Sequence, residues 1–166
     1  ANLTNAKLGQ ADLSGAFLCE AVLSGANLIG ADASEANFSE ANLYRAYLSG
    51  IHAPRAILRK AFLHQANLRE AVLTDSNLSN AVLDGANLGG ANLSGAYLQS
   101  AQCKGTLFQG AILTNALLTN ANLERADLQM AQITVAELVG ARLWSLLTIS
   151  IDQGLAQQLR SVLSSF

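Results

Sequence analysis

Small and large apolar residues recur along this chain with a period of five residues. From Ala1 to Ala141 every fifth residue is Ala, except at Ile51, Ser76 and Thr106. The residue two positions after each of these is Leu with six exceptions, which are Ala33, Phe38, Ala53, Cys103, Phe108 and Ile133. Within each repeat the second position is usually Asn or Asp, the fourth favours Ser or Thr, and the fifth favours Gly. No insertion or deletion breaks this pattern up to residue 145.

A period of five fits neither an α-helix nor a straight β-strand. Five helical residues overshoot a full turn by about 140°, so the apolar residues would spread around the whole helix. A strand alternates faces every residue, so an odd period would turn each successive repeat to the opposite face. A chain that bends after every fifth residue keeps all Ala and Leu side chains on the inside. Gly and Asn at the fifth position suit such corners, where a positive φ is often required.

The pattern A-[N/D]-L-[S/T]-X over residues 1–145 resembles the pentapeptide-repeat family, which is common in bacteria and especially in cyanobacteria. The resemblance implies an all-β solenoid, a right-handed quadrilateral β-helix with four repeats per coil. Leu or Phe and the small residue of each repeat would fill the interior. We therefore expect about seven coils, with each residue stacked on the one twenty positions later. The four faces of the first coil are then 1–5, 6–10, 11–15 and 16–20.

The terminal coils of a solenoid expose unpaired edges and need caps. We predict a C-terminal capping segment at 146–166, in which Ser150 and Gln153 form a capping box. An amphipathic helix at about 151–164 would cover the last coil with an apolar face, consisting of Ile151, Leu155, Leu159, Val162, Leu163 and Phe166. No equivalent segment precedes Ala1. Either a second subunit covers that end, forming a homodimer through the first coil, or part of the natural chain is missing.

Stacking at twenty residues makes specific columns testable. Glu35, Arg55 and Asp75 should form one column of alternating charge, and Glu40 and Lys60 should pair in another. These pairs would be exposed and would contribute less than about 1 kcal/mol each.

One region of the predicted core combines several unusual residues. Ala33 and Ala53 share a column in adjacent coils, where Leu is the rule. The larger Phe38 and Ile51 beside them should fill the space that the two small side chains leave. Pro54, the only proline, lies in the same coil and removes one backbone donor there.

Composition excludes several functional classes. The net charge is −2 and only 13% of residues are charged. A nucleic-acid-binding protein needs a basic surface to neutralise phosphates, so we expect no nucleic-acid partner. No apolar run is long enough for a transmembrane helix. The compartment stays open among cytoplasm, which is favoured weakly, periplasm and thylakoid lumen.

Candidate chemistry is sparse. Asp12, Asp32 and His52 share a column. Neighbouring coils, about 4.8 Å apart, could bring two of these side chains to one ion, but no third ligand for it is obvious, so we favour solvated surface over a metal site. A convex rod offers no cleft for a catalytic group, and no cofactor is expected. Cys19 falls on the outside and Cys103 on the inside, about four coils apart, so they cannot form a disulfide.

Two surface patterns point to a partner. Basic residues concentrate in one coil and the next, at His52, Arg55, Arg59, Lys60, His64 and Arg69. This is either a charge-compensated surface or a docking patch for an anionic partner. Apolar residues also occupy second positions on the fourth and first faces, where we expect a protein-binding edge formed by Phe17, Val22, Ile57, Phe62, Val82, Tyr97 and Leu117. We call these residues the apolar edge.

We interpret the chain as a non-catalytic structural or protein-interaction module that presents flat β-helix faces to another protein. The alternative is a DNA-mimicking inhibitor of gyrase, an activity that some pentapeptide-repeat proteins resembling this one have. Those proteins use an acidic rod surface, whereas the charges here are mixed and nearly balanced. The sequence does not identify the partner or the oligomeric state, nor whether the chain is a fragment of a larger protein.

Overall fold

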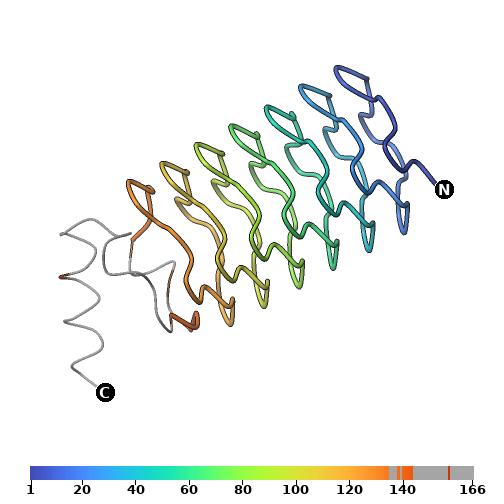
Figure 1. The fold of residues 1–166 in the computed structure, drawn as a ribbon. Coiled ribbons are helices and arrows are strands. Elements are labelled where there is room, and N and C mark those ends of the chain that lie inside the picture. Colours follow the sequence, from blue (N-terminus) through green and yellow to red (C-terminus); the bar gives the residue numbers. More distant parts are fainter. Residues whose placement is uncertain (135–137, 139, 144–156, 158–166) are drawn as a thin grey trace.

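Stacked coils of nearly identical shape build the part of the molecule that the structure describes (Figure 1). The computed structural model describes residues 1–134, 138, 140–143 and 157. Within this part each repeat contributes one bridge residue, at every second position from Asn2 to Gln132 and again at Arg142, followed in most repeats by a turn. All the bridges described are parallel and join residues twenty apart, from Asn2 with Val22 to Asn122 with Arg142. The predicted superposition of residues twenty apart is therefore confirmed.

Backbone hydrogen bonds hold each coil to the next. The third-position N–H of Leu63 donates to the carbonyl of Val82 at 2.7 Å, and the fifth-position N–H of Gln65 donates to Asp84 at 3.1 Å. In the other direction, the second-position N–H of Phe62 donates to the carbonyl of Ala41 at 2.9 Å. The same pattern recurs on all four faces, so each coil acts as the pairing template for the next one.

A tight turn at the fourth and fifth positions forms each corner. The N–H of Ala66, which begins a new repeat, donates to the carbonyl of Leu63 at 3.0 Å, and Gln65 between them has a φ of 56°. A bond from residue i+3 to residue i, with positive φ only at i+2, defines a type II turn. The predicted positive φ at the fifth position is confirmed throughout the described repeats, at non-glycine residues as well as at glycine.

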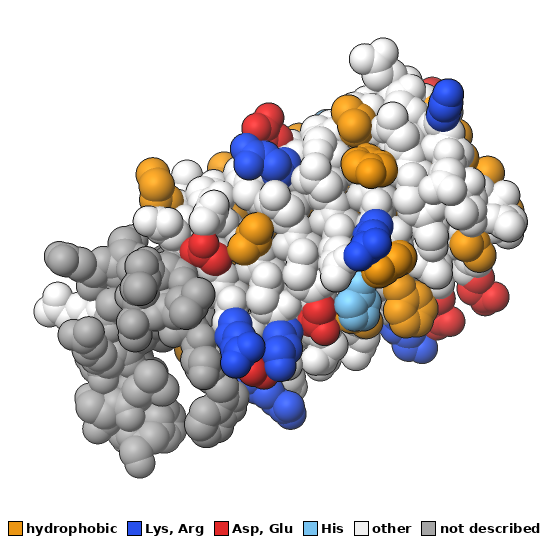
Figure 2. All heavy atoms as spheres, viewed as in Figure 1, with side chains coloured by type: hydrophobic (Ala, Val, Ile, Leu, Met, Phe, Trp, Pro, Cys, Tyr) orange, Lys and Arg blue, Asp and Glu red, His pale blue; other side chains and the backbone are white. Residues whose placement is uncertain are grey.

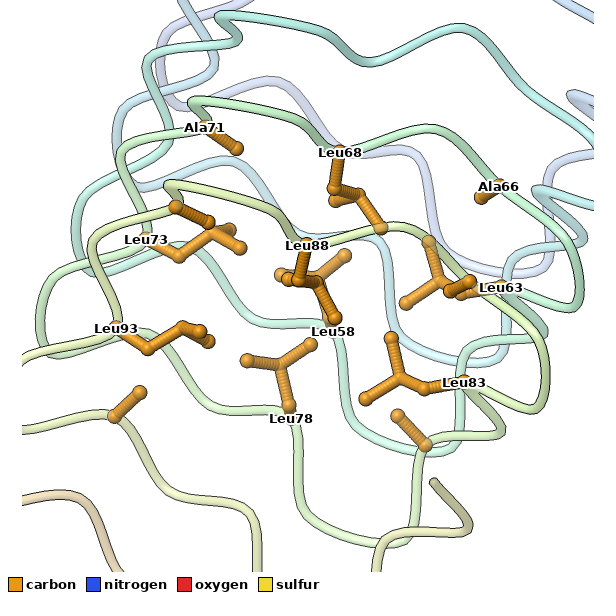
Figure 3. Packing of buried hydrophobic residues seen from close by; sticks show 14 of the residues in the cluster. Leu58, Leu63, Ala66, Leu68, Ala71, Leu73, Leu78, Leu83, Leu88 and Leu93 are labelled. Carbon is orange, nitrogen blue, oxygen red and sulfur yellow. The ribbon is translucent and has the colours of Figure 1, made fainter. Parts of the chain in front are cut away.

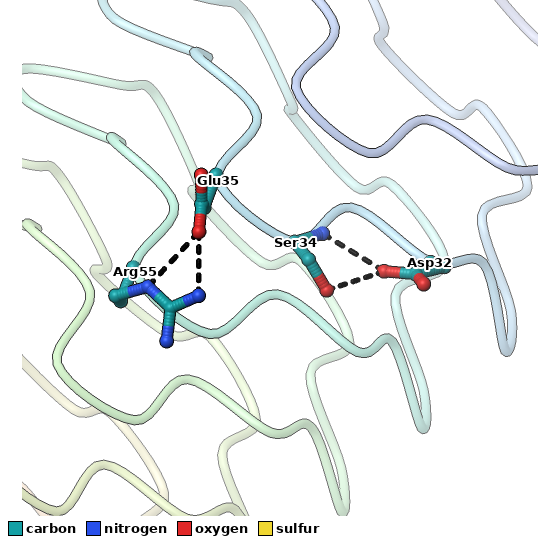
Figure 4. A network of polar contacts seen from close by, with 4 residues as sticks. All are labelled: Asp32, Ser34, Glu35 and Arg55. Atoms are coloured by element: carbon teal, nitrogen blue, oxygen red, sulfur yellow. Dashed lines mark hydrogen bonds and ion pairs between the residues drawn. The ribbon is translucent and has the colours of Figure 1, made fainter.

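The fourth-position N–H takes no part in the ladder between the described coils. Where the second residue is Asn or Asp, its side chain accepts this N–H instead, as Asn92 Oδ1 does from Ser94 N at 3.0 Å. The Ser94 hydroxyl donates to the same oxygen at 2.7 Å. Asp32 and Ser34 make the equivalent pair (Figure 4). This local turn explains why Asn or Asp precedes Ser or Thr by two residues in so many repeats.

Pro54 occupies a fourth position, which explains why the coil tolerates it. No ladder bond requires an N–H there, and position i+1 of a type II turn favours proline. Its carbonyl still accepts the N–H of Glu35 at 3.0 Å. The backbone donor that proline removes is thus one that the ladder does not use.

Leucine side chains from all four faces meet in the interior. Figure 3 shows leucines of eight successive repeats pointing inward, namely Leu58, Leu63, Leu68, Leu73, Leu78, Leu83, Leu88 and Leu93. All of these are buried, as are the small pair Ala33 and Ala53 and the larger Phe38 and Ile51 beside them. Burial of each leucine contributes about 1.5–3 kcal/mol, so the interior supplies most of the folding free energy.

Two buried hydroxyl groups replace alanine without breaking the core. Ser76 Oγ donates to the carbonyl of Leu73 at 2.7 Å, and Thr106 Oγ1 donates to the carbonyl of Leu83 at 2.8 Å. Both side chains are fully buried. Their hydrogen bonds offset the cost of burying a polar group.

The two ends differ in what the structure describes. In the first coil Leu3, Leu8, Leu13 and Leu18 are only half-buried, because no coil precedes them in the described chain. The capping helix predicted at 151–164 lies outside the described residues, apart from Gln157.

The turn geometry predicts where proline is tolerated. Thr74→Pro, at a fourth position, should change the free energy of unfolding by less than about 1 kcal/mol. Val72→Pro, in the same repeat, removes the N–H that donates to Ile51 at 2.9 Å and should lose about 3 kcal/mol or more. Urea denaturation followed by circular dichroism measures both, and equal losses would contradict the proposed turn.

The Asp–Ser turns predict a pH dependence. The hydroxyl and N–H of Ser14 lower the pKa of Asp12, and those of Ser34 lower the pKa of Asp32. A lowered pKa in the folded state contributes stability above the unfolded pKa of about 3.9, and this stability is lost as the pH falls through the folded pKa. The variant Asp12→Asn keeps the acceptor oxygen at that turn but does not titrate there. The stability of wild type relative to this variant should therefore be constant above about pH 5 and decrease below about pH 4. A difference that rises on acidification would contradict the assignment.

Candidate protein-binding surface

The fourth face places its apolar residues on the outside of the rod. Phe17 is 89% exposed, Tyr97 44% and Leu117 45%, while Ile57 is less exposed. Along this face the order of bridge partners is Phe17, Asn37, Ile57, Asn77, Tyr97 and Leu117. Asparagine therefore separates the first three apolar residues, and only Tyr97 and Leu117 are direct neighbours.

The first face carries the other part of the apolar edge. Val22 and Phe62 are exposed, whereas Val82 is half-buried. Asn42 lies between Val22 and Phe62, while Phe62 and Val82 are direct bridge partners. The apolar edge thus consists of two continuous pairs, Phe62 with Val82 and Tyr97 with Leu117, and of single residues separated by asparagine. Figure 2 shows one side of the molecule, where hydrophobic side chains lie in small groups, several of them beside charged side chains.

The structure exposes further large apolar residues that the apolar edge did not include. They are Ile29, Tyr44, Tyr47, Leu107 and Met130. Tyr47 and Leu107 occupy second positions, as the residues of the apolar edge do, but they lie on the second face. The others lie at corner positions, where exposure depends on how each side chain turns away from the coil.

Opposite charges pair along the columns as predicted. Arg55 donates from Nε to the Glu35 carboxylate at 3.1 Å (Figure 4), and Lys60 Nζ lies 3.1 Å from Glu40 Oε1. The hydrogen bond from Arg55 to Glu35 raises the pKa of the arginine, and the charges of Glu35 and Asp75 add to this effect. These exposed pairs contribute little stability. They neutralise Arg55 and Lys60, two members of the basic cluster that consists of His52, Arg55, Arg59, Lys60, His64 and Arg69.

Other members of the basic cluster differ in their partners. His64 Nε2 lies 3.8 Å from Asp84 Oδ2, and Arg69 lies 3.7 Å from Glu70. Within the described chain, Arg59 forms no ion pair within 4.0 Å. The cluster is therefore compensated in most places, while Arg59 and His52 have no carboxylate within 4.0 Å among the described residues.

The column of Asp12, Asp32 and His52 is real, since Asp12 bridges Asp32 and Asp32 bridges His52. Both carboxylates are engaged by the serine two residues later. Among the described residues, no group of three or more His, Cys, Asp or Glu side chains is arranged to hold a metal ion. No helix in the same part of the chain is both long and apolar enough to cross a membrane.

The two cysteines lie where the repeat positions predict. Cys19 is exposed and Cys103 is buried. Burial raises the pKa of the Cys103 thiol far above its usual range, and the negative charge of Asp84 adds to this. Cys103 therefore behaves as a packed core residue rather than as a reactive thiol.

Comparison with known families identifies the class of protein. A family model described as pentapeptide repeats matches residues 1–39, 36–75, 76–115 and 101–136. These matches cover most of the chain, which therefore belongs to the pentapeptide repeat family. The fold of this family is a right-handed β-helix. No curated protein sequence matches the chain.

Several solved structures are similar to this chain. HetL, a pentapeptide repeat protein involved in the regulation of heterocyst differentiation in the cyanobacterium Nostoc sp. strain PCC 7120, is 33% identical. That match covers 86% of this chain and 72% of HetL, with a TM-score of 0.44. QnrB1, a plasmid-mediated fluoroquinolone resistance protein, is 20% identical over 96% of this chain and 84% of its own, with a TM-score of 0.48. A pentapeptide repeat protein from the thylakoid lumen of Arabidopsis thaliana is 24% identical over 83% of this chain and 72% of its own, with a TM-score of 0.38.

The contrast between the two cysteines predicts their reactivity. In the native protein a thiol-specific reagent such as DTNB should modify Cys19 quickly and Cys103 only after denaturation. The variant Cys19→Ser should show no fast thiol, while its total after denaturation should be one. Fast modification of Cys103 in the native Cys19→Ser variant would show that the interior opens near that residue.

Proposed function

We propose that this chain is a non-catalytic interaction module that binds another protein through its apolar edge. Pentapeptide repeat proteins are generally non-catalytic structural or interaction modules. The observation that supports binding here is the outward position of large apolar side chains on two adjoining faces, above all at Phe62 and Tyr97. Interfaces are enriched in such aromatic residues, and their side chains supply much of the binding energy.

The geometry favours binding to an extended or flat protein surface. Each face consists of parallel bridges whose outward side chains follow the rod axis at the spacing of neighbouring strands, about 4.8 Å. Phe62 with Val82 and Tyr97 with Leu117 are adjacent pairs at this spacing. A partner that lies along the corner between the fourth and first faces would contact both pairs.

DNA mimicry is the weaker alternative. A mimic of DNA needs a continuous negative surface, whereas Glu35 and Glu40 are each neutralised by a basic residue of the next coil. A supercoiling assay with purified gyrase separates the two functions directly, since an interaction module of the proposed kind should not inhibit the enzyme.

The finer features of the architecture belong to the same proposal. These are a rod of about seven coils over 1–145, a capping segment at 146–166, and homodimerisation through the first coil. The half-buried leucines of residues 1–20 motivate the dimer. Each of these features remains a prediction.

Substitution in the apolar edge tests the proposed function. Affinity purification with the wild-type chain should identify a partner, and its dissociation constant should then be measured with purified proteins. Phe62→Ser with Tyr97→Ser should weaken that binding by roughly a thousandfold, because hot-spot aromatic residues contribute about 2 kcal/mol or more each and every 1.4 kcal/mol is about a factor of ten.

Leu107→Ser provides the matched control. Leu107 is an exposed second-position residue of the second face, outside the apolar edge, and its substitution should leave the affinity unchanged. Circular dichroism should confirm that all variants keep the wild-type fold. Equal affinities for wild type and the double variant would contradict binding through this edge.

A further inference from the structure

Positive charge surrounds Phe62 on the first face. Arg59 and Lys60 precede it at one corner, and His64 follows it at the next corner. Phe62 is 48% exposed, and its bridge partner Val82 continues the apolar surface into the next coil. In the segment 59–65 the aromatic ring of Phe62 therefore lies between two corners of the coil that carry basic side chains.

Arg45 adds a positive charge at the second of these corners, beside Gln65. Its Nε donates to Gln65 Oε1 at 2.7 Å, so the guanidinium reaches from its own coil to the coil of Phe62. The same guanidinium lies 5.1 Å from the centre of the Tyr44 ring, a distance at which a cation is attracted to the ring face. Both of these partners are neutral, so the positive charge of Arg45 is held in place but not cancelled.

The carboxylates near Phe62 neutralise only part of this charge. Glu40 pairs with Lys60, and Asp84 lies near His64. In the part of the chain that the structure describes, no carboxylate lies within 4.0 Å of the guanidinium of Arg45 or of Arg59. The surface around Phe62 is thus locally positive, although the whole chain has a net charge of −2.

We propose that this surface, formed by Tyr44, Arg45, Arg59, Phe62 and Val82, binds an acidic peptide segment of a protein partner. An apolar side chain of that segment packs on Phe62 and Val82, and flanking carboxylates pair with Arg45 and Arg59. The inference rests on the proposed protein-binding function and adds the chemistry of the partner. Arginine suits this role because its planar guanidinium can bind a carboxylate through two hydrogen bonds.

Two observations favour a peptide over a nucleic acid. A nucleic acid needs a row of cations along its phosphates, whereas Glu40 and Asp84 interrupt the positive charges here. The half-buried Val82 beside Phe62 widens the apolar surface along the rod. Such a surface fits an aliphatic or aromatic side chain of a peptide.

Binding of defined peptides to the full chain tests the proposal. The first probe is a fluorescein-labelled peptide of alternating Asp and Glu with one central Phe. The second has Lys in place of every acidic residue, and the third has Ala in place of the Phe. Fluorescence polarisation should show the tightest binding for the first probe. Its affinity should decrease as salt is raised, because exposed charge pairs are screened.

Matched variants locate the binding site. Arg45→Gln with Arg59→Gln should weaken binding of the acidic Phe probe by roughly tenfold or more, and Phe62→Ser should weaken it by a similar factor. The control is Arg125→Gln, which removes an exposed arginine whose Nε lies 4.0 Å from Glu124 and which is far along the rod. This control should bind the probe as wild type does.

Three outcomes would overturn the proposal. They are equal binding of the acidic and basic probes, tighter binding of single-stranded oligo(dT) than of the acidic probe, and equal losses at Arg125 and at the two proposed arginines. The proposed function can fail separately from this inference. Suppose that Phe62→Ser with Tyr97→Ser weakens binding of a purified partner, whereas Arg45→Gln with Arg59→Gln does not. The apolar edge then binds protein, but the inference that the bound segment is acidic is wrong.

Discussion

The hydrogen bonds between successive coils determine everything else in this structure. Each repeat uses the N–H groups of its second, third and fifth residues for the neighbouring coils, and the first N–H closes the corner. This arrangement gives the backbone N–H groups hydrogen-bond partners without long strands, because each repeat contains only a single β-bridge residue. It also fixes which side chains point inward. Alanine and leucine fill the interior since they are apolar and fit the two inward positions of every repeat.

Much of the fold could be predicted from the sequence because the pattern is repeated so many times without interruption. The period of five required a bend in every repeat, and the positive φ at residues such as Gln65 confirms the bend. The stacking at twenty residues came from the family resemblance rather than from the period. The pairing of Arg55 with Glu35 shows that it was right. The preference for Asn and Asp was visible in the sequence, but its cause was not. Only the structure shows that Asn92 accepts the N–H of Ser94.

The surface was less predictable than the core. The rule that apolar residues at second positions are exposed held for Phe17 and Phe62, while Val82 is half-buried. A periodic pattern gives the face on which a residue lies, but not how far its side chain extends or which neighbour covers it. The same limit applies to charge. The sequence located the basic cluster but did not include Arg45 in it. Whether Arg45 or Arg59 reaches a carboxylate depends on where each flexible side chain ends, and in the described part of the chain neither forms an ion pair within 4.0 Å. Arg45 turns toward Gln65 rather than toward a carboxylate.

Closure of the coil after four repeats has a consequence for how such proteins change length. Duplication or loss of twenty residues adds or removes one complete layer and leaves every later residue above the same column. Loss of a single repeat keeps the inward and outward pattern, but rotates all later residues by a quarter turn around the axis. If the lost repeat lies between Val82 and Tyr97, the Phe62–Val82 pair and the Tyr97–Leu117 pair no longer face adjoining directions. Selection on a binding surface that spans several layers should therefore favour length changes in whole layers, even though the interior would tolerate either kind.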